Sequence, residues 1–357
     1  MKNIFVTLII MILMGTGCSI SPNREHSDIN TYKNIDNKND YFNSDINSEA
    51  FNIQNLLTDS GKFIRTNTQL CTIKYHKLHS IYRNIVIEGN IGINEDKHPI
   101  ILDTGASQPV ILNSAIVKKN NLPVYNLKNI NTNLNGHEFG ICQLSKLEFG
   151  EVTCEGWPCI YFESHNKLNL FEIPIASSIY DSDNIILGLP LLREFKYIRF
   201  DNINKEAQLS YYQPFSPQYP EEWNKYPIYI EEDFHGNAFL FVRINIAGYE
   251  TELQLDTGSG KGIAISESLW QKINDNLKET KLKKGKDFYP YIGNLPCKKG
   301  EISEFEFGNR TINNAKISIF NDDCPLLDGC EGLVGMQFFS NTEFVLDFEY
   351  DLMWIKK

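Results

Sequence analysis

The chain has 357 residues, of which 42% are hydrophobic and 22% are charged, so it is long enough and apolar enough to form two domains with substantial cores. This composition excludes a disordered or fibrous protein. The formal net charge of -11 argues against a nucleic-acid-binding surface, and we expect no nucleic-acid partner. The basic cluster at residues 278–286 is predicted to be a solvated loop or helix end.

The first residues are predicted to form a targeting segment, because Lys2 precedes an apolar stretch, Ile4–Met14, that is too short to span a bilayer. The sequence Gly-Thr-Gly-Cys that follows, ending at Cys18, resembles the lipobox of bacterial lipoproteins, although Gly15 departs from it. The resemblance implies a signal peptide over 1–17, a lipid on Cys18, and an exported protein anchored to a membrane of the bacterial cell envelope. An ordinary secretory signal with an incidental cysteine is the alternative.

Residues 18–67 are predicted to be a flexible, lipid-anchored tether, because they are rich in Asn, Asp, Ser and Lys and show neither a helical nor a strand period. Export favours disulfides, which persist outside the cytoplasm. Two close cysteine pairs, Cys154 with Cys159 and Cys324 with Cys330, are therefore predicted to form short disulfide loops. Seven cysteines follow Cys18, so at least one thiol stays free or pairs with another molecule.

From residue 68 onwards, short runs rich in Ile, Val, Phe and Tyr are separated by Gly, Asn and Pro, which predicts an all-β fold. The same order of segments occurs twice: a hairpin, Asp-Thr-Gly, a strand ending in glycine, and an apolar-apolar-Gly segment. We therefore expect an N-terminal lobe over 68–213 and a C-terminal lobe over 223–357. The proline-containing residues 214–222 are predicted to link them.

Each Asp-Thr-Gly triplet follows an apolar strand, and each is followed at a similar distance by Leu-Gly or Val-Gly, at Gly188 and Gly335. This doubled pattern resembles the aspartic proteases, and the resemblance covers most of residues 70–357. It implies a two-lobed aspartic protease fold with β-barrel-like lobes related by a pseudo-twofold axis. The short lobes resemble a fused pair of retropepsin-like units more than a full pepsin.

The resemblance implies that Asp103 and Asp256 are catalytic and meet across the pseudo-twofold axis. Two carboxylates about 3 Å apart cannot both be ionised, so they would share one proton. One would act as the general base that activates a water, and the other as the general acid toward the scissile carbonyl. This mechanism uses no cofactor and no metal.

Supporting roles are implied for Thr104, Gly105 and Ser107 beside the first aspartate and for Thr257, Gly258 and Ser259 beside the second. The threonines are expected to exchange hydrogen bonds, and the two glycines of the triplets to leave backbone room beside the carboxylates. Ser107 is expected to hydrogen-bond the first carboxylate; the second copy has Gly260 at this position, and Ser259 is its candidate substitute. Gly188 and Gly335 are expected to pack beneath the two aspartate loops.

Two mobile hairpins are predicted to close over a cleft, one carrying His137 and Phe139 and the other carrying Tyr289 and Tyr291. The predicted function is a membrane-tethered aspartic endopeptidase, acting as a monomer on extended polypeptide. One alternative is a non-catalytic peptide-binding protein that retains the protease fold. Another is a glycosidase carboxylate pair, which requires a wider separation of the carboxyl groups.

Overall fold

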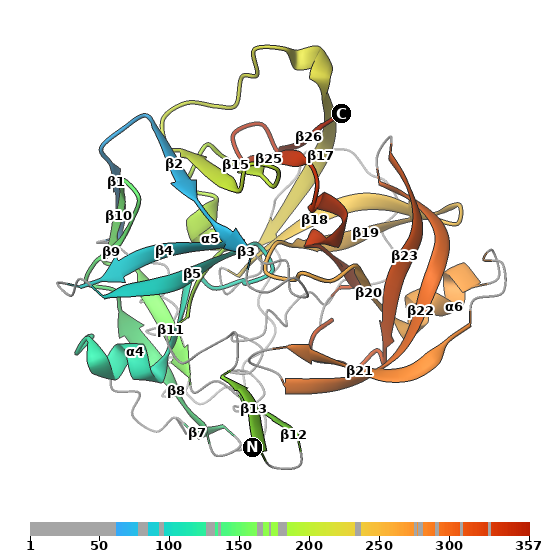
Figure 1. Ribbon diagram of the computed structural model, residues 1–357, viewed down its shortest axis with the longest axis horizontal. Coiled ribbons are helices and arrows are strands. Elements are labelled where there is room, and N and C mark those ends of the chain that lie inside the picture. Colours follow the sequence, from blue (N-terminus) through green and yellow to red (C-terminus); the bar gives the residue numbers. More distant parts are fainter. Residues whose placement is uncertain are drawn as a thin grey trace, which may run out of the picture.

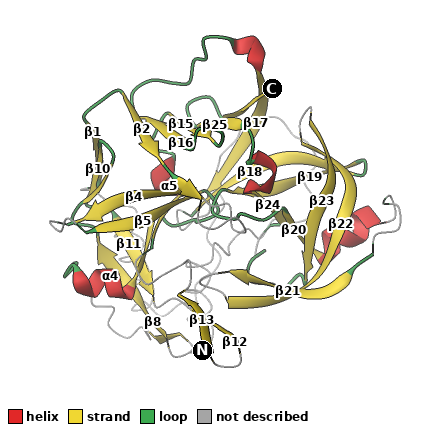
Figure 2. Cartoon of the chain, in the orientation of Figure 1, coloured by secondary structure: helices red, strands yellow, loops and turns green. Residues whose placement is uncertain are grey.

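The computed structural model describes residues 62–77, 85–92, 96–125, 133–134, 137–162, 167–170, 173–177, 184–232, 237–274, 277, 281–289, 293–307, 310–327 and 330–357. The predicted signal peptide and Cys18 lie outside these ranges. The described chain is mostly β-structure, as the sequence predicts (Figure 2). Within these ranges, no helix combines the length and the apolar character needed to cross a membrane.

The first large sheet is built from the chain before residue 190 (Figure 1). In spatial order it consists of β1 (Phe63–Thr66), β10 (Val152–Glu155), β9 (Leu147–Phe149), β4 (Ile85–Ile91), β5 (Lys97–Asp103), β14 (Ile185–Gly188), β6 (Val110–Asn113), β11 (Pro158–Phe162), β8 (His137–Gln143) and β7 (Asn133–Leu134), with β3 (His76–Lys77) paired to β4. A separate hairpin joins β12 (Lys167–Leu170) and β13 (Ile173–Ser177).

The second large sheet combines strands from both ends of the described chain. In spatial order it consists of β2 (Leu70–Lys74), β16 (Glu206–Ser210), β15 (Tyr197–Asp201), β25 (Glu343–Asp347), β26 (Leu352–Lys356), β17 (Trp223–Glu232), β18 (Ala238–Ile246), β19 (Tyr249–Asp256), β24 (Gly332–Gly335), β20 (Ile263–Ser266), β23 (Arg310–Phe320), β22 (Gly293–Phe307) and β21 (Lys283–Tyr289). Because β18 also pairs with β22, this part of the sheet curls back on itself.

The helices among the described residues are short. They are α4 (Ser114–Lys119), α5 (Leu189–Leu192), α6 (Glu267–Asn274), and the 3-10 turns η1 (Pro220–Glu222) and η2 (Met336–Phe339). The side chain of Asn113 caps α4 by accepting a hydrogen bond from the amide of Ala115 at 2.9 Å. α5 and η2 directly follow β14 and β24, so the two halves of the chain place a helical turn at the same point.

The sequence repeat corresponds to a repeat of strand pairing. β5 runs parallel to β14, β14 antiparallel to β6, and β6 parallel to β11. β19, β24, β20 and β23 repeat these three relationships in the same order. In both sets the aspartate lies opposite the glycine of the apolar-apolar-Gly segment, Asp103 opposite Gly188 and Asp256 opposite Gly335. The two candidate aspartates therefore occupy equivalent positions.

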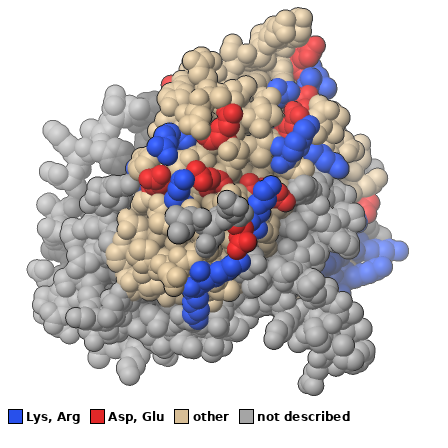
Figure 3. Space-filling model, turned by 60° about the vertical axis from the view of Figure 1, so that its left-hand side comes forward, with Lys and Arg blue, Asp and Glu red and all other residues tan. Residues whose placement is uncertain are grey.

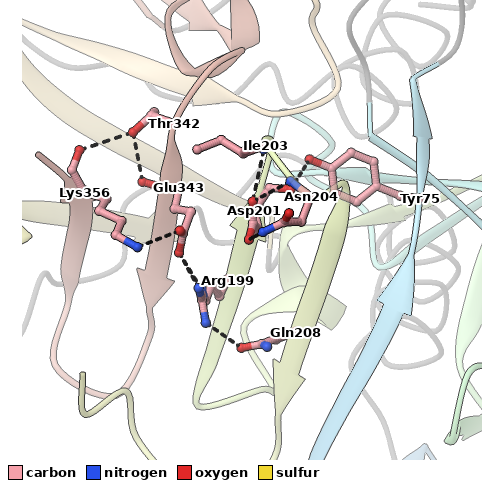
Figure 4. Close-up of polar contacts among 9 residues, drawn as sticks. All are labelled: Tyr75, Arg199, Asp201, Ile203, Asn204, Gln208, Thr342, Glu343 and Lys356. Carbon is pink, nitrogen blue, oxygen red and sulfur yellow. Dashed lines mark hydrogen bonds and ion pairs between the residues drawn. The ribbon is translucent and has the colours of Figure 1, made fainter. Parts of the chain in front are cut away.

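The antiparallel strands β15 and β25 join the two parts of the chain (Figure 4). Across this pair, the guanidinium of Arg199 donates to Glu343, through Nε at 3.0 Å and also through a terminal nitrogen. Lys356 donates to the other oxygen of the same carboxylate at 2.8 Å, and Arg199 also donates to Gln208 at 3.2 Å. Glu343 is only 5% exposed, and its charge is balanced by two cations from two strands.

Two predictions about the periphery of the fold differ from the structure. Residues 63–66, assigned to the tether, form β1 instead, because Phe63–Thr66 pairs antiparallel with Val152–Glu155 and buries Ile64. The segment 214–222 does link the two sets of strands, but it is also anchored to them. The ring of Phe215 packs edge-on against Trp223 and Trp354, with centroid separations of 5.2 and 5.3 Å.

The predicted short disulfide loops are not formed among the described residues, where Cys154, Cys159 and Cys324 are free thiols. Cys154 lies on β10 opposite Leu147, whereas Cys159 lies on β11 opposite Cys142, so the two cysteines belong to strands with different neighbours. Burial raises the pKa of Cys154 to about 12, which keeps it as a thiol. Nearness in sequence is therefore a poor guide to cysteine pairing in this sheet.

Candidate active site

Each candidate aspartate lies at the end of a buried strand. Ile100, Ile101 and Leu102 of β5 are buried on both faces of the sheet, and the chain turns directly after Asp103. The amide of Ala106 donates to the carbonyl of Asp103 at 3.3 Å, and the amide of Ser259 donates to that of Asp256 at the same distance. Two identical turns thus carry the carboxylates away from the core.

The two turns are joined by a symmetric set of hydrogen bonds between Thr104 and Thr257. The amide of Thr104 donates to the hydroxyl of Thr257 at 3.0 Å, and the amide of Thr257 donates to the hydroxyl of Thr104 at 3.1 Å. The hydroxyls donate in turn to the carbonyls of Leu255 and Leu102, at 2.6 and 2.7 Å. The exchange expected between the threonines is present, and both residues are fully buried.

Gly105 and Gly258 make room for the carboxylates, each for that of the other copy. A Cβ atom on Gly105 would lie 2.6 Å from Cγ of Asp256, closer than carbon atoms pack. A Cβ atom on Gly258 would overlap the carboxyl group of Asp103. Only glycine therefore lets the two aspartates converge, which is the reason for glycine at both positions.

The carboxyl groups of Asp103 and Asp256 are hydrogen-bonded to each other. Burial, followed by the charge of Asp103 and the hydrogen bond to it, raises the pKa of Asp256 well above its ordinary value. Burial also raises the pKa of Asp103, and the hydrogen bonds from Asp256 and from backbone amides partly offset this rise. The two carboxyl groups therefore titrate as one unit rather than as two independent groups.

Backbone amides donate to both carboxylates. Asp103 accepts from the amides of Gly105, at 2.8 Å, and of Ala106 and Gly258. Asp256 accepts from the amides of Gly258 and Ser259. Because the charge of Asp103 and the hydrogen bond to it raise the pKa of Asp256 well above its ordinary value, the arrangement favours the negative charge on Asp103 and the proton on Asp256.

Ser107 does not take the position expected for it. It is buried, but no hydrogen bond from it to Asp103 exists among the described residues; backbone amides supply the donors instead. Ser259, considered as a substitute in the second copy, contributes its amide to Asp256, while its hydroxyl accepts from the amide of Lys261 at 3.4 Å. Side-chain support from serine is thus replaced by main-chain support in both copies.

Gly188 and Gly335 lie directly beneath the two aspartate loops, as expected. The amide of Leu189, after Gly188, donates to the carbonyl of Ala106 at 2.9 Å, and the amide of Met336, after Gly335, donates to that of Ser259 at 2.7 Å. A Cβ on either glycine would collide with a loop carbonyl. These glycines hold the loops in place without touching the carboxylates.

Sequence reasoning missed a buried amide network beside the first loop. Gln108 donates through Nε2 to Oδ1 of Asn237, which is 1% exposed, and Gln254 donates to the carbonyl of Gly105 at 3.4 Å. These contacts join β18 and β19 to the loop that follows Asp103. Nothing in their local sequence marks these residues, apart from the position of Gln108 five residues after Asp103.

The predicted covering hairpins are described only in part. Tyr291 and the side chains of His137 and Phe139 lie outside the described residues. Tyr289 ends β21, and its hydroxyl is buried without a hydrogen-bond partner in the described structure. Burial, followed by the charges of Asp287 and Asp256, raises the pKa of Tyr289 well above its ordinary value. Tyr289 therefore lies within electrostatic reach of the second carboxylate.

No protein-family model matches this chain, and no curated protein matches it either. A functional assignment must therefore come from the chemistry of the site rather than from relatives.

Proposed function

We propose that the protein is an aspartic endopeptidase with a two-lobed aspartic protease fold. One observation carries the proposal: two equivalent strand-turn segments, tied together by Thr104 and Thr257, bring Asp103 and Asp256 into direct hydrogen-bonded contact. A hydrogen-bonded carboxyl pair that retains some exposure to solvent is the chemical unit that hydrolyses peptide bonds without a covalent intermediate.

The reaction follows from the unequal rise in pKa of the two carboxyl groups. Asp103 carries the negative charge and removes a proton from a water, whose oxygen attacks the carbonyl carbon of the peptide bond. Asp256 donates its proton to the carbonyl oxygen, which gives a neutral tetrahedral diol. When the diol collapses, the carbon-nitrogen bond breaks, a proton passes to the leaving amine, and the pair returns to its single-proton state.

The contact between the carboxyl groups distinguishes this reaction from glycoside hydrolysis. Glycosidases hold their two carboxyl groups roughly 5 to 9.5 Å apart to leave room for the sugar and the water. Asp103 and Asp256 are instead hydrogen-bonded to each other, which favours an addition at a carbonyl. The alternative of a non-catalytic peptide-binding protein is separated from the endopeptidase by experiment.

The proposal extends to location. The short apolar segment before Cys18 favours an exported lipoprotein that is held on a membrane of the bacterial cell envelope and acts as a monomer. Its substrate would be extended or unfolded polypeptide that reaches the envelope.

The test is hydrolysis of unfolded proteins and of a diverse peptide pool by the full-length protein between pH 3 and pH 8. Asp103→Asn and Asp256→Asn should each abolish nearly all activity, and the double variant should be scarcely worse, because residues of one catalytic unit are not additive. Asp323→Asn, at an exposed position, is the matched control. The wild-type rate should fall as the pH rises through the upper apparent pKa of the pair.

Should Asp256→Asn keep more than about a tenth of the wild-type rate, equivalent to less than about 1.4 kcal/mol of barrier, the shared-proton mechanism is wrong. If the wild type binds peptides but cleaves none at any pH, the non-catalytic alternative replaces the endopeptidase.

A further inference from the structure

A large cavity opens beside the second aspartate loop. It has a volume of about 910 Å³ and is lined by β20, β21, β22 and β23 together with the loop residues Gly260, Lys261 and Gly262. This loop starts one residue after Ser259, whose amide donates to the carboxyl group of Asp256. The cavity therefore lies next to the candidate dyad along the chain. Tyr289 also lines it, and the charge of Asp256 contributes to raising the pKa of this tyrosine.

The described lining of this cavity is strongly basic, although the whole chain is acidic. Among the described residues, six lysines line it against two carboxylates; the lysines are Lys261, Lys281, Lys283, Lys284, Lys299 and Lys316, and the carboxylates are Asp287 and Glu301. The formal net charge of the protein is -11. Over much of the face of the molecule drawn in Figure 3, by contrast, basic and acidic side chains are interspersed. The lysine excess of the cavity thus has the opposite sign to the net charge of the chain.

Two of the six lysines are ion-paired within the cavity. Nζ of Lys261 and Nζ of Lys299 both contact Oδ1 of Asp287, at 3.0 and 2.8 Å, and Ser318 donates to the other oxygen of the same carboxylate at 2.6 Å. The carbon chain of Lys299 reaches Asp287 by lying over Gly285, where a Cβ would be 3.0 Å from its Cδ. The two lysines share the single negative charge of Asp287, so one positive charge remains even in this group.

The remaining four lysines have no ion-pair partner within the described chain. Lys281, Lys283, Lys284 and Lys316 are exposed at the rim, and Lys316 makes no ion pair with Glu301 although the two lie opposite each other on β23 and β22. Lysines elsewhere are commonly paired, for example Lys97 with Glu88 at 3.2 Å and Lys146 with Glu148 at 2.7 Å. The rim therefore presents four positive charges to whatever enters the cavity.

Tyr289 is part of this basic lining. Its ring packs against the ammonium group of Lys261, 4.2 Å from the ring centroid, and the charge of Asp256 helps to raise its pKa. Its hydroxyl is buried and is therefore not accessible to a ligand in the cavity, so the ring and not the hydroxyl contributes to the lining.

From this arrangement we infer that the cavity binds an acidic side chain of the polypeptide substrate, so that cleavage is favoured where Glu or Asp lies within a few residues of the scissile bond. The inference rests on the proposed endopeptidase function and adds its specificity. A carboxylate supplies the negative charge that the rim lysines lack. A neutral glutamine of the same shape supplies none.

The test uses the full-length protein and matched peptides that differ only by Glu or Gln at one position, placed in turn at each of four residues on either side of a cleaved bond. At pH 5.5, where a free Glu is ionised, we expect kcat/KM to be at least tenfold higher for Glu at one or two positions. The ratio should shrink in 1 M salt, which screens charges beyond about 3 Å. It should also vanish below about pH 4, where Glu becomes protonated.

The triple variant K283Q/K284Q/K316Q should lower the ratio to less than threefold, whereas K97Q/K146Q, with two lysines that do not line the cavity, should keep it. A wild-type ratio within twofold at every position, or an unchanged ratio in the triple variant, overturns the inference while leaving the endopeptidase intact. If no peptide is cleaved, the proposed endopeptidase function is wrong. Fluorescence anisotropy with the same peptides then tests the present inference by binding. Tighter binding of the Glu peptides that the triple variant loses supports it, and equal affinities overturn it.

Discussion

Thr104 and Thr257 each receive a hydrogen bond from the backbone amide of the other, so each aspartate loop is directly bonded to its counterpart. The four hydrogen bonds of this exchange are buried and span more than 150 residues of sequence. Assembly of the candidate site and association of the two sets of strands are therefore one structural event.

The threonine exchange predicts a difference between two substitutions at one position. Thr104→Val keeps the shape but removes the hydroxyl, which leaves the amide of Thr257 without its acceptor and the carbonyl of Leu255 without its donor. We expect a loss of about 2 to 4 kcal/mol in the free energy of unfolding, since each buried unsatisfied group costs about 1 to 3 kcal/mol. Thr104→Ser retains the hydroxyl and should lose less than half as much. Urea unfolding of both variants measures this, and equal losses would show that the exchange adds little stability.

The glycines of the two triplets predict a loss of activity that exceeds any loss of folding. Gly258→Ala places a methyl group against the carboxyl of Asp103 and forces the pair apart, at a cost of about 1 to 3 kcal/mol in stability. We expect peptidase activity to fall at least a hundredfold while the circular dichroism spectrum is kept. Gly248→Ala is the control. Gly248 has a positive φ of 83°, but a Cβ atom added there would have no atom within 4 Å. Gly248→Ala strains the backbone but does not displace the carboxyl groups of Asp103 and Asp256, so its activity should stay near that of wild type.

The raised pKa values of the dyad predict how stability changes with pH. Because folding raises the pKa of both carboxyl groups, the folded protein prefers their protonated forms, and this contribution is lost as the pH rises through the folded-state values. The side chain introduced by Asp256→Asn is neutral at every pH, so this variant does not lose stability through ionisation at position 256 as the pH rises. Its melting temperature should exceed that of wild type at pH 7, with little difference at pH 3.5. An advantage of equal size at both pH values would contradict the shared proton.

Asp287 predicts the opposite dependence on pH. Burial alone would raise its pKa, but hydrogen bonds from Lys299 and Ser318 and the charge of Lys261 lower it to about 2. Its contribution is therefore present above the ordinary pKa of 3.8 and is lost as the pH falls toward 2. Asp287→Asn should reduce the free energy of unfolding at pH 6 by about 2 kcal/mol, at 1.36 kcal/mol per pKa unit, and by much less at pH 2. Denaturant titrations at the two pH values test this.

The predicted lipid anchor is tested by Cys18→Ser, which removes the thiol that would carry the lipid. We expect the variant to leave the membrane fraction and to appear in the soluble fraction, because the apolar segment before it is too short to span a bilayer. Cys71→Ser, at a buried position, is the control that keeps the anchor. If Cys18→Ser remains on the membrane after a carbonate wash, the anchor lies elsewhere.

The sequence was sufficient to predict the parts of the site whose chemistry is local. An apolar run ending in Asp-Thr-Gly requires a buried strand, a turn and a close approach of backbone to carboxylate, and both copies have these features. The repeat spacing indicated that Asp103 and Asp256 occupy equivalent positions. The parallel pairing of each aspartate strand with its glycine segment confirms this equivalence.

Predictions that depended on distant partners were less successful. The lysine cluster over 278–286 looks like solvated loop because its charges dominate, yet Lys283–Tyr289 is a strand paired along β22. Phe63–Thr66 has no marked hydrophobic period, and it forms a strand because it pairs with the free edge of β10. Ser107 was placed by analogy, whereas the amides of Gly105, Ala106 and Gly258 supply the donors to Asp103. For the two strands, the deciding contact lies elsewhere in the chain.

The pairing of β15 with β25 also determines when the site can form during synthesis. Tyr197–Asp201 meets Glu343–Asp347, and β26 follows, so the sheet that joins the two halves is incomplete until the chain has been made well past Asp256. Such long-range pairing forms late, because it must wait for both partners. A growing chain would therefore contain both aspartates without the completed sheet, and the proposed endopeptidase would gain its activity only after β25 and β26 had been made.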